Sequence, residues 1–257
     1  MLKHITAVAA LFTFVAPMAY ADSIEIIGPD LPPMIMPDGS GREAEIIRTT
    51  LEHCGHDVTF TIQPFTRHWS SFDAGQGDAV TTVPVGMPTA GTESDSYIAY
   101  QNGVSFLADR AAPIEDLNGL HGMNVVTFRG AESILPGLAD HIAEFGDYRE
   151  ITDQIVHSRL LFSGRIDAVI GDGMIFAEYN RHLAESADDH GFNPSQATVF
   201  NATFAPSNYA MAFRNPAHTA DFNRCFAELT ADGTIQAINV KWVEQYRDTL
   251  GQEYMGY

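Results

Sequence analysis

Gly75-Gln76-Gly77-Asp78-Ala79-Val80 recurs later in the chain as Gly164-Arg165-Ile166-Asp167-Ala168-Val169. Each copy follows a stretch of helical character that contains a phenylalanine, Phe72 or Phe162, and each copy opens an apolar run. A helix, a glycine turn and a buried strand are therefore predicted twice. Chance can produce one match of this length, so the repeat indicates two related halves only if the surrounding sequence agrees.

The sequence before the first copy has the pattern of an α/β unit. Residues 24–28 and 58–62 are short, apolar and rich in β-branched side chains, so we expect a strand at each. Between them, Ser40-Gly41-Arg42-Glu43 has the form of a capping box, and apolar residues follow at helical spacing as far as Cys54. This order of elements indicates an α/β domain, and the repeat then favours two similar lobes.

The end of the chain continues the α/β pattern. Residues 209–213 predict a strand, and residues 221–229 and 234–246 predict two helices separated by Asp232-Gly233. Low-complexity sequence and long linkers are absent from the sequence. Two lobes without a linker suggest that the chain crosses between them more than once.

The first residues predict export. Met1 to His4 is a short positive start, Ile5 to Ala16 is apolar, and Ala19-Tyr20-Ala21 is a small-x-small cleavage signal. We therefore expect a signal peptide over residues 1–21, cleavage after Ala21 and a periplasmic mature chain. No cysteine follows the cleavage site and no later stretch is apolar enough for a span, so neither a lipid anchor nor membrane insertion is expected.

The charge of the chain excludes several kinds of partner. It has 14 Lys and Arg against 33 Asp and Glu, a net charge of −19. Nucleic acid and anionic membrane surfaces are repelled by such a chain, so neither is expected as a partner. Apolar residues make up 45% of the sequence, which provides for a folded core.

The two cysteines, Cys54 and Cys225, have two interpretations. In an oxidising compartment an isolated pair is more often a disulfide than two free thiols. A catalytic thiol is the less favoured interpretation, because no recognisable partner pattern accompanies either cysteine. The sequence alone does not show that the two residues meet.

Several motifs in order along nearly the whole mature chain resemble the family 3 extracellular solute-binding proteins, which serve mainly polar amino acid uptake. Both copies of the repeat belong to this resemblance. The other motifs are Ile24 to Gly28 followed by Pro33 and Asp38-Gly39-x-Gly41, then Ile114-x-Asp116-Leu117-x-Gly119-x-x-Gly122-x-x-Val125, and finally Gly233-x-Ile235-x-x-Ile238-x-x-Lys241-Trp242.

The resemblance implies an α/β fold of two lobes, the type II periplasmic binding protein fold, with two crossings at the hinge. Lobe 1 would contain residues 22–107 and 207–257, and lobe 2 residues 108–206. Both cysteines then lie in lobe 1, which implies a disulfide between Cys54 and Cys225. The implied function is capture of a small polar ligand, amino-acid-like or carboxylate-bearing, by a monomer that serves an inner-membrane ABC permease.

In lobe 2 the candidate ligand residues follow two predicted strands. Gly130, Glu132 and Ser133 begin a helix whose free amides can hold an anion, and Arg129 would add charge. An ordinary turn with a surface arginine is the alternative. Asp172 ends the predicted strand 166–171 at the position where the family grips a ligand amine, with a helix N-cap as the alternative.

In lobe 1 the sequence departs from the family pattern. Ala90 stands where the family has the arginine that clamps an α-carboxylate, which argues against an ordinary amino acid ligand. Arg67, in Pro64-Phe65-Thr66-Arg67, is a candidate substitute, and a surface arginine is the alternative. Phe65 and Trp69 provide either a stacking wall or core packing. Weaker candidates by analogy are Pro33, Met34, Thr81 and Thr82.

Three other functions are alternatives to ligand capture for transport. Catalysis is not expected: hydrolase, zinc-protease and nucleotide-binding motifs are absent from the sequence, and Asp172-Gly173-Met174-Ile175 supplies no second acid for the dehydratase chemistry that one branch of this fold performs. Metal binding at His53-Cys54-Gly55-His56-Asp57 is a weak signal, so neither a metal nor another cofactor is expected. A sensory or accessory binding role is compatible with every motif.

Overall fold

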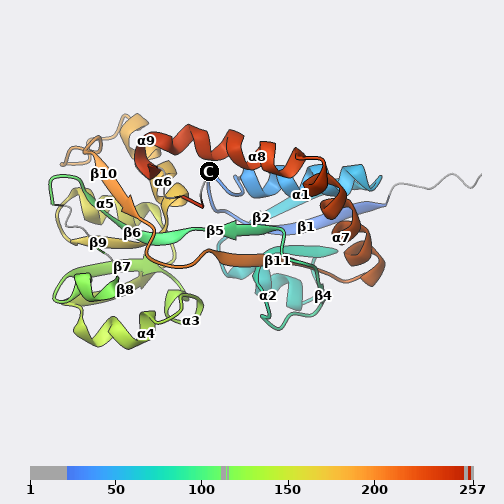
Figure 1. Cartoon of the computed structure of the whole chain (residues 1–257), viewed down its shortest axis with the longest axis horizontal. Coiled ribbons are helices and arrows are strands. Elements are labelled where there is room, and N and C mark those ends of the chain that lie inside the picture. The colour runs from blue at the N-terminus through green and yellow to red at the C-terminus, as the bar shows by residue number, and fades with distance from the viewer. Residues whose placement is uncertain (1–21, 111–113, 115, 252–253, 256–257) are drawn as a thin grey trace, which may run out of the picture.

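The structure is a computed structural model, and it describes residues 22–110, 114, 116–251 and 254–255. The predicted signal peptide lies outside the described residues. Two α/β lobes are each built on their own sheet, and the lobes lie side by side along the long axis of the molecule (Figure 1). In the described part of the chain, no helix combines the length and the apolar character needed to cross a membrane.

The sheet of lobe 1 has the strand order β2-β1-β3-β11-β4, and β5 also pairs with β11. Strands β1, β2 and β3 are parallel, whereas β11 is antiparallel to its neighbours. The helices between β1, β2 and β3 belong to this lobe, together with the helix that follows β11. The bounds are β1 (Ser23–Pro29), α1 (Arg42–His53), β2 (Asp57–Gln63), α2 (Arg67–Asp73), β3 (Ala79–Pro84), β4 (Thr92–Glu93), β5 (Ile98–Tyr100), β11 (Ser207–Phe213) and α7 (Pro216–Ala231).

The sheet of lobe 2 has the strand order β10-β6-β9-β7-β8. Strands β7, β8 and β9 are parallel, and β6 is antiparallel to both β9 and β10. The bounds are β6 (Asn102–Leu107), η1 (Leu117–Leu120), β7 (Asn124–Phe128), α3 (Ala131–Ile134), α4 (Leu138–His141), η2 (Ile142–Glu144), β8 (Asp147–Ile151), α5 (Ile155–Phe162), β9 (Ala168–Asp172), α6 (Gly173–Glu185) and β10 (Thr198–Asn201).

The two copies of the sequence repeat perform the same structural task in the two lobes. The Asp78 carboxylate accepts a hydrogen bond from the Glu25 amide at 2.9 Å, and Asp167 accepts one from the Asn124 amide at 2.8 Å. Each aspartate directly precedes the strand that begins in its repeat, β3 or β9. Its hydrogen bond ties that strand to the parallel strand beside it, β1 or β7. Gly77 has φ 62° and a Cβ there would lie 2.6 Å from Ile27, so this turn requires glycine.

The chain passes between the sheets twice. The first crossing lies between β5 and β6, and the second lies between β10 and β11. The expected boundary after Leu107 assigned residues 102–107 to lobe 1, but the pairing of β6 with β9 and β10 places this strand in the sheet of lobe 2. The expected boundary is the approximate one of the family, and the residues of this strand do not themselves specify which lobe it joins.

A C-terminal helical run forms a further connection between the lobes. Helix α8 (Thr234–Val243) packs on α1 in lobe 1, and η3 (Glu244–Tyr246) and α9 (Arg247–Leu250) continue across to α6 and β10 in lobe 2. Figure 1 shows this run extending along one side of both lobes. The C-terminal residues are therefore not confined to lobe 1, where the sequence analysis placed them.

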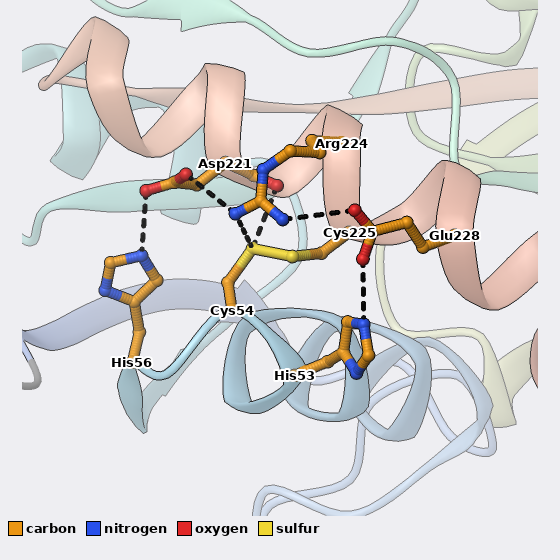
Figure 2. Close-up of polar contacts among 7 residues, drawn as sticks. All are labelled: His53, Cys54, His56, Asp221, Arg224, Cys225 and Glu228. Carbon is orange, nitrogen blue, oxygen red and sulfur yellow. Dashed lines mark hydrogen bonds and ion pairs between the residues drawn. A yellow bond between two sulfur atoms is a disulfide. The ribbon is translucent and has the colours of Figure 1, made fainter.

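Cys54 and Cys225 form a disulfide, with their Cα atoms 5.9 Å apart. It joins the C-terminal end of α1 to the middle of α7 within lobe 1 (Figure 2). Polar side chains surround it: Arg224 contacts Asp221 at 3.1 Å and Glu228 at 3.2 Å, and Glu228 also contacts His53 at 3.0 Å. The expected pairing of the two cysteines is present in the structure.

The capping box predicted at Ser40 to Glu43 is wrong. Gly41 is the N-cap of α1, with φ 125°, and no side chain caps this end. The Ser40 hydroxyl bonds Asp38 at 2.6 Å instead, and the Glu43 side chain is directed into the lobe interior, where it is fully buried. The N–H groups of Arg42 and Glu43 donate to the carbonyl oxygens of Pro33 and Met34 at 2.9 Å each.

Candidate ligand-binding site

A cavity lies between the two lobes and is lined from both. The space open to the centre of a water molecule is about 10 Å³, which is room for about one water, so the lobes are closed on it. The side chains around it come from β5, β6, β7, β9, β11 and α6 and from the segments that follow β1, β2 and β8. They are Leu31, Phe65, Tyr100, Asn102, Phe128, Gln154, Asp172, Ile175 and Tyr209.

Four aromatic rings form much of the cavity wall. Phe65 of lobe 1 meets Phe128 of lobe 2 edge to face, with ring centroids 6.4 Å apart. Tyr100 and Tyr209, at the two chain crossings, lie with ring centroids 4.6 Å apart. Because the Phe65–Phe128 contact joins the lobes directly, a ligand that enters the cavity separates these two rings or comes to lie between them.

Asp172 is the charged side chain of the cavity wall. It ends β9 and is the N-cap of α6, where its Oδ1 accepts hydrogen bonds from the amides of Met174 at 2.9 Å and Ile175 at 3.0 Å. Its Oδ2 accepts a hydrogen bond from the Tyr254 hydroxyl at 2.8 Å. Burial raises the pKa of Asp172 to about 6, although these donors favour the ionised form. The Asp172 side chain therefore both caps α6 and lines the cavity.

Tyr254 connects Asp172 to a buried arginine of the other lobe. Its hydroxyl lies 3.5 Å from Nη1 of Arg42, the first residue of α1, which is 1% exposed. Arg42 also donates to Asn239 Oδ1 at 2.9 Å and to the Ala99 carbonyl at 3.3 Å. A chain of polar contacts thus runs from α1 through the C-terminal tail to the cavity wall, and the sequence contained no signal for it.

A second buried carboxylate lies behind the cavity wall. Glu43 accepts hydrogen bonds from the hydroxyls of Thr81, Thr82, Tyr97 and Tyr100, and all five residues are buried. Burial and the charge of Glu43 raise the pKa values of Tyr97 and Tyr100 well above their ordinary range, so both phenols remain donors. Thr81 and Thr82, expected to bind ligand, are instead held beneath the surface by this carboxylate.

The anion site expected at the start of α3 is filled by the protein itself. The amides of Gly130 and Glu132 donate to the Glu150 carboxylate at 2.8 and 2.9 Å. Burial alone raises the pKa of Glu150, but these two amide donors bring it below its ordinary value. Arg129 is exposed beside Glu150, and Ser133 lines a neighbouring groove between the lobes that shares Tyr209 with the cavity. Neither residue lines the cavity.

The remaining lobe 1 candidates also lie outside the cavity wall. Arg67 is exposed at the start of α2, whereas Phe65, two residues earlier, lines the cavity. Ala90 lies exposed in a loop, where its amide bonds Asp73 at 2.8 Å. Pro33 and Met34 support the start of α1 through their carbonyl groups, and the neighbouring Leu31 lines the cavity instead.

Two further carboxylates, one from each lobe, lie next in sequence to residues of the cavity wall. Asp30 precedes Leu31, and Asp153 precedes Gln154. Burial and the charge of Asp153 raise the pKa of Asp30, so the two carboxylates interact across the lobes. Their negative charge favours a cation over an anion beside the cavity.

Two groups of side chains in the described ranges lie close enough to hold a metal ion, and both are in lobe 1 away from the cavity. One contains His53, Cys225 and Glu228, but the Cys225 sulfur belongs to the disulfide. The other contains Asp22, His56 and His218. His56 and His218 also bond carboxylates, those of Asp221 and Asp22, at 3.3 Å each. The expectation that the protein binds no metal is still a prediction.

Solved structures with this fold are numerous. A histidine kinase sensor domain with similarity to periplasmic binding proteins matches with a TM-score of 0.66 and 22% identity, over 86% of this chain and 96% of that chain. An ancestral amino acid-binding protein, a precursor of cyclohexadienyl dehydratase, matches with a TM-score of 0.67 and 18% identity, over 86% and 95%.

A substrate-binding protein of an ABC uptake transporter from Streptococcus pneumoniae, with bound histidine, matches with a TM-score of 0.63 and 18% identity, over 86% of this chain and 92% of that chain. No family model and no curated protein matches the sequence. At these identities the likeness establishes the fold, so the expected two-lobed periplasmic binding protein fold is confirmed. The ligands of the similar proteins remain statements about those proteins.

Proposed function

We propose that this protein is an exported receptor that encloses a small molecule between its lobes and has no catalytic activity. The observation that carries the proposal is the cavity itself, which is lined from both lobes and lies where the chain crosses between them. Binding that closes two lobes removes water from the ligand and strengthens its polar contacts.

The chemistry of the cavity supports binding rather than catalysis. Asp172 is the acidic residue among those that line it, and its two oxygens already accept three hydrogen bonds from the protein. The other titratable side chains that line it are Tyr100 and Tyr209, and burial raises the pKa of each further from neutral, so neither is suited to be the partner of Asp172 in a general acid and base pair. Incubation with prephenate and arogenate tests this part of the proposal, and formation of an aromatic product would contradict it.

Delivery of the ligand to an inner-membrane ABC permease is the first candidate for the downstream step, and a sensory role is the second. Proteins of both kinds share this fold, as the similar transporter component and the similar kinase sensor domain show for themselves. Uptake of a radiolabelled ligand by cells with and without the gene distinguishes them. Unchanged uptake in the deletion strain would rule out the transport role.

The test of the receptor proposal is a thermal-unfolding screen of the mature chain against amino acids, carboxylates, amines and osmolytes. A ligand present at 100 times its Kd stabilises the folded state by about 2.7 kcal/mol. For a domain of this size we expect a rise in Tm of about 5–10 °C. If no compound in a broad library shifts Tm, the cavity does not serve as a receptor site.

A further inference from the structure

We infer that the cavity accepts a small organic cation with an apolar surface, such as an alkylated ammonium group, and that it has no clamp for a ligand carboxylate. The inference rests on the proposed receptor function and specifies the ligand class. Four observations lead to it: the charge buried around the cavity, its aromatic walls, an amide in its wall, and the two carboxylates beside it.

The buried charges around the cavity leave a negative excess. Asp172 and Glu43 are both carboxylates with exposures of 3% and 0%, and Arg42 is the buried cation near them. Arg42 is held by Asn239, Ala99 and Tyr254 and does not line the cavity. His68, behind Phe65, adds no charge, because burial lowers its pKa to about 3. A ligand cation would neutralise this excess, whereas an anion would add to it.

The aromatic walls are suited to a cation with little hydrogen-bonding capacity. Phe65, Phe128, Tyr100 and Tyr209 surround the space in front of Asp172. Ring faces attract an ammonium group electrostatically, and the attraction is stronger where water is excluded. A primary amine would gain less, because Asp172 already accepts three hydrogen bonds and has little remaining capacity for N–H donors.

Gln154 provides a neutral polar contact at the same place. It is 8% exposed and lines the cavity, and its amide atoms are not among the fully buried polar atoms without a partner in the described part of the chain. A ligand that fills the cavity removes this amide from solvent, so a polar group on the ligand is expected to meet it. Asn102, by contrast, already donates to Ser207 at 3.1 Å.

Recognition of a carboxylate has no support in the described cavity. None of its lining residues is arginine or lysine, and the amides that begin α6 and α3 are bonded to Asp172 and Glu150. Asp30 and Asp153, beside the cavity, oppose an anion further. Addition of a carboxylate to a bound cation should therefore weaken binding rather than strengthen it.

The first experiment is isothermal titration of the mature chain with matched probes. They are a graded series of alkylammonium ions, choline, its uncharged isostere 3,3-dimethylbutan-1-ol, zwitterionic amino acids, and dicarboxylates. We expect the tightest ligand to be a cation without a carboxylate, and choline to bind at least about tenfold more tightly than its isostere. A zwitterion or an anion as the tightest ligand would overturn the inference while leaving the receptor function intact. Absence of binding by every probe and by a wider library would overturn both.

Substitution of the two phenylalanines that meet between the lobes tests the contact between the aromatic rings and the cation. Phe65→Leu and Phe128→Leu keep an apolar side chain but remove the ring, so affinity for the best cation should fall about 3- to 30-fold, whereas affinity for the uncharged isostere should change less than about threefold. Phe192→Leu is the matched control, because Phe192 stacks on Phe162 away from the cavity. Equal losses for the charged and uncharged probes would show a merely apolar pocket and refute the ring–cation contact.

Discussion

Asp172 is ionised at neutral pH in a place that disfavours its charge. Burial raises its pKa from 3.8 to about 6, against the opposing effects of Ile175, Tyr254, Arg42 and Met174. A carboxyl group with a raised pKa in the folded state stabilises the fold most below pH 4, and this contribution is lost as the pH rises through 6. The side chain therefore reduces stability at neutral pH, which is typical of a group retained for binding.

The variant Asp172→Asn tests this directly. Asparagine keeps an oxygen for the amides of Met174 and Ile175 but cannot ionise. Relative to the parent chain, the unfolding free energy of the variant should rise by about 2–3 kcal/mol between pH 4 and pH 7.5. Urea titrations at several pH values measure it. A difference between the two proteins that does not change with pH would show that Asp172 titrates normally.

Glu43 depends on its hydroxyl donors, because its carboxylate is completely buried. In Glu43→Gln an NH₂ group replaces one oxygen and meets hydroxyls that now have to turn from donors into acceptors. We expect a loss of about 1–3 kcal/mol in unfolding free energy, measured by urea denaturation. Glu52→Gln, at an exposed position of the same helix α1, is the control and should change stability by less than about 0.5 kcal/mol. Equal changes in unfolding free energy for both variants would show that the four hydroxyl groups bonded to Glu43 do not contribute to stability.

Residue-scale prediction from the sequence succeeded where the structure is local. The repeat predicted a glycine turn and a strand at Asp78 and Asp167, and β3 and β9 begin directly after them, but the hydrogen bonds of the two aspartates to Glu25 and Asn124 were not predicted. Arg67 and Arg129 were predicted to supply positive charge to a ligand, but both are exposed. Whether a charged side chain turns into a cleft depends on packing with distant residues, which neighbouring sequence does not specify.

At the scale of elements, the disulfide joins the end of α1 to the middle of α7, two helices that are far apart in the sequence. Cys54 and Cys225 are separated by 171 residues, so the cross-link greatly restricts the unfolded chain. The double variant Cys54→Ala/Cys225→Ala should lose about 2–5 kcal/mol of unfolding free energy, measured by denaturant titration. Addition of a reductant should destabilise the parent chain in the same direction and leave the double variant unchanged. Destabilisation of the double variant by reductant would point to a cause other than the disulfide.

At the scale of elements, the sequence predicted features that a segment determines by itself and missed features that depend on distant segments. The strands at residues 24–28, 58–62 and 209–213 and the helices near the C-terminus are present, because hydrophobic periodicity is a property of the segment itself. The start of α3 was predicted as a free anion site, but Glu150 arrives from β8, a neighbour only in the folded sheet. Tyr100, Gln154 and Tyr209 were missed for the same reason, since each reaches the cavity only through the arrangement of the lobes.

At the scale of the whole molecule, the C-terminal tail holds the two lobes together. The run α8–η3–α9 crosses from lobe 1 to lobe 2, and Tyr254 then places a fully buried phenol between Arg42 and Asp172. The family resemblance correctly implied two lobes, but it assigned the whole C-terminal segment to lobe 1. No periodic or compositional signal marks a single tyrosine near a chain end, so only the fold reveals this connection.

The variant Tyr254→Phe removes the shared hydroxyl and retains the buried ring. Hydrogen bonds to charged partners contribute about 1.5–3 kcal/mol, so the closed arrangement should lose about tenfold or more of its population advantage over an open one. Small-angle scattering of the unliganded protein should then give a larger radius of gyration, and hydrogen exchange should accelerate at β6 and β9. Tyr148→Phe is the control, because the Tyr148 hydroxyl bonds Glu150 within lobe 2. If Tyr254→Phe and Tyr148→Phe leave the scattering equally unchanged, the lobes are held closed by the apolar contact of Phe65 with Phe128, and the tail only fills space.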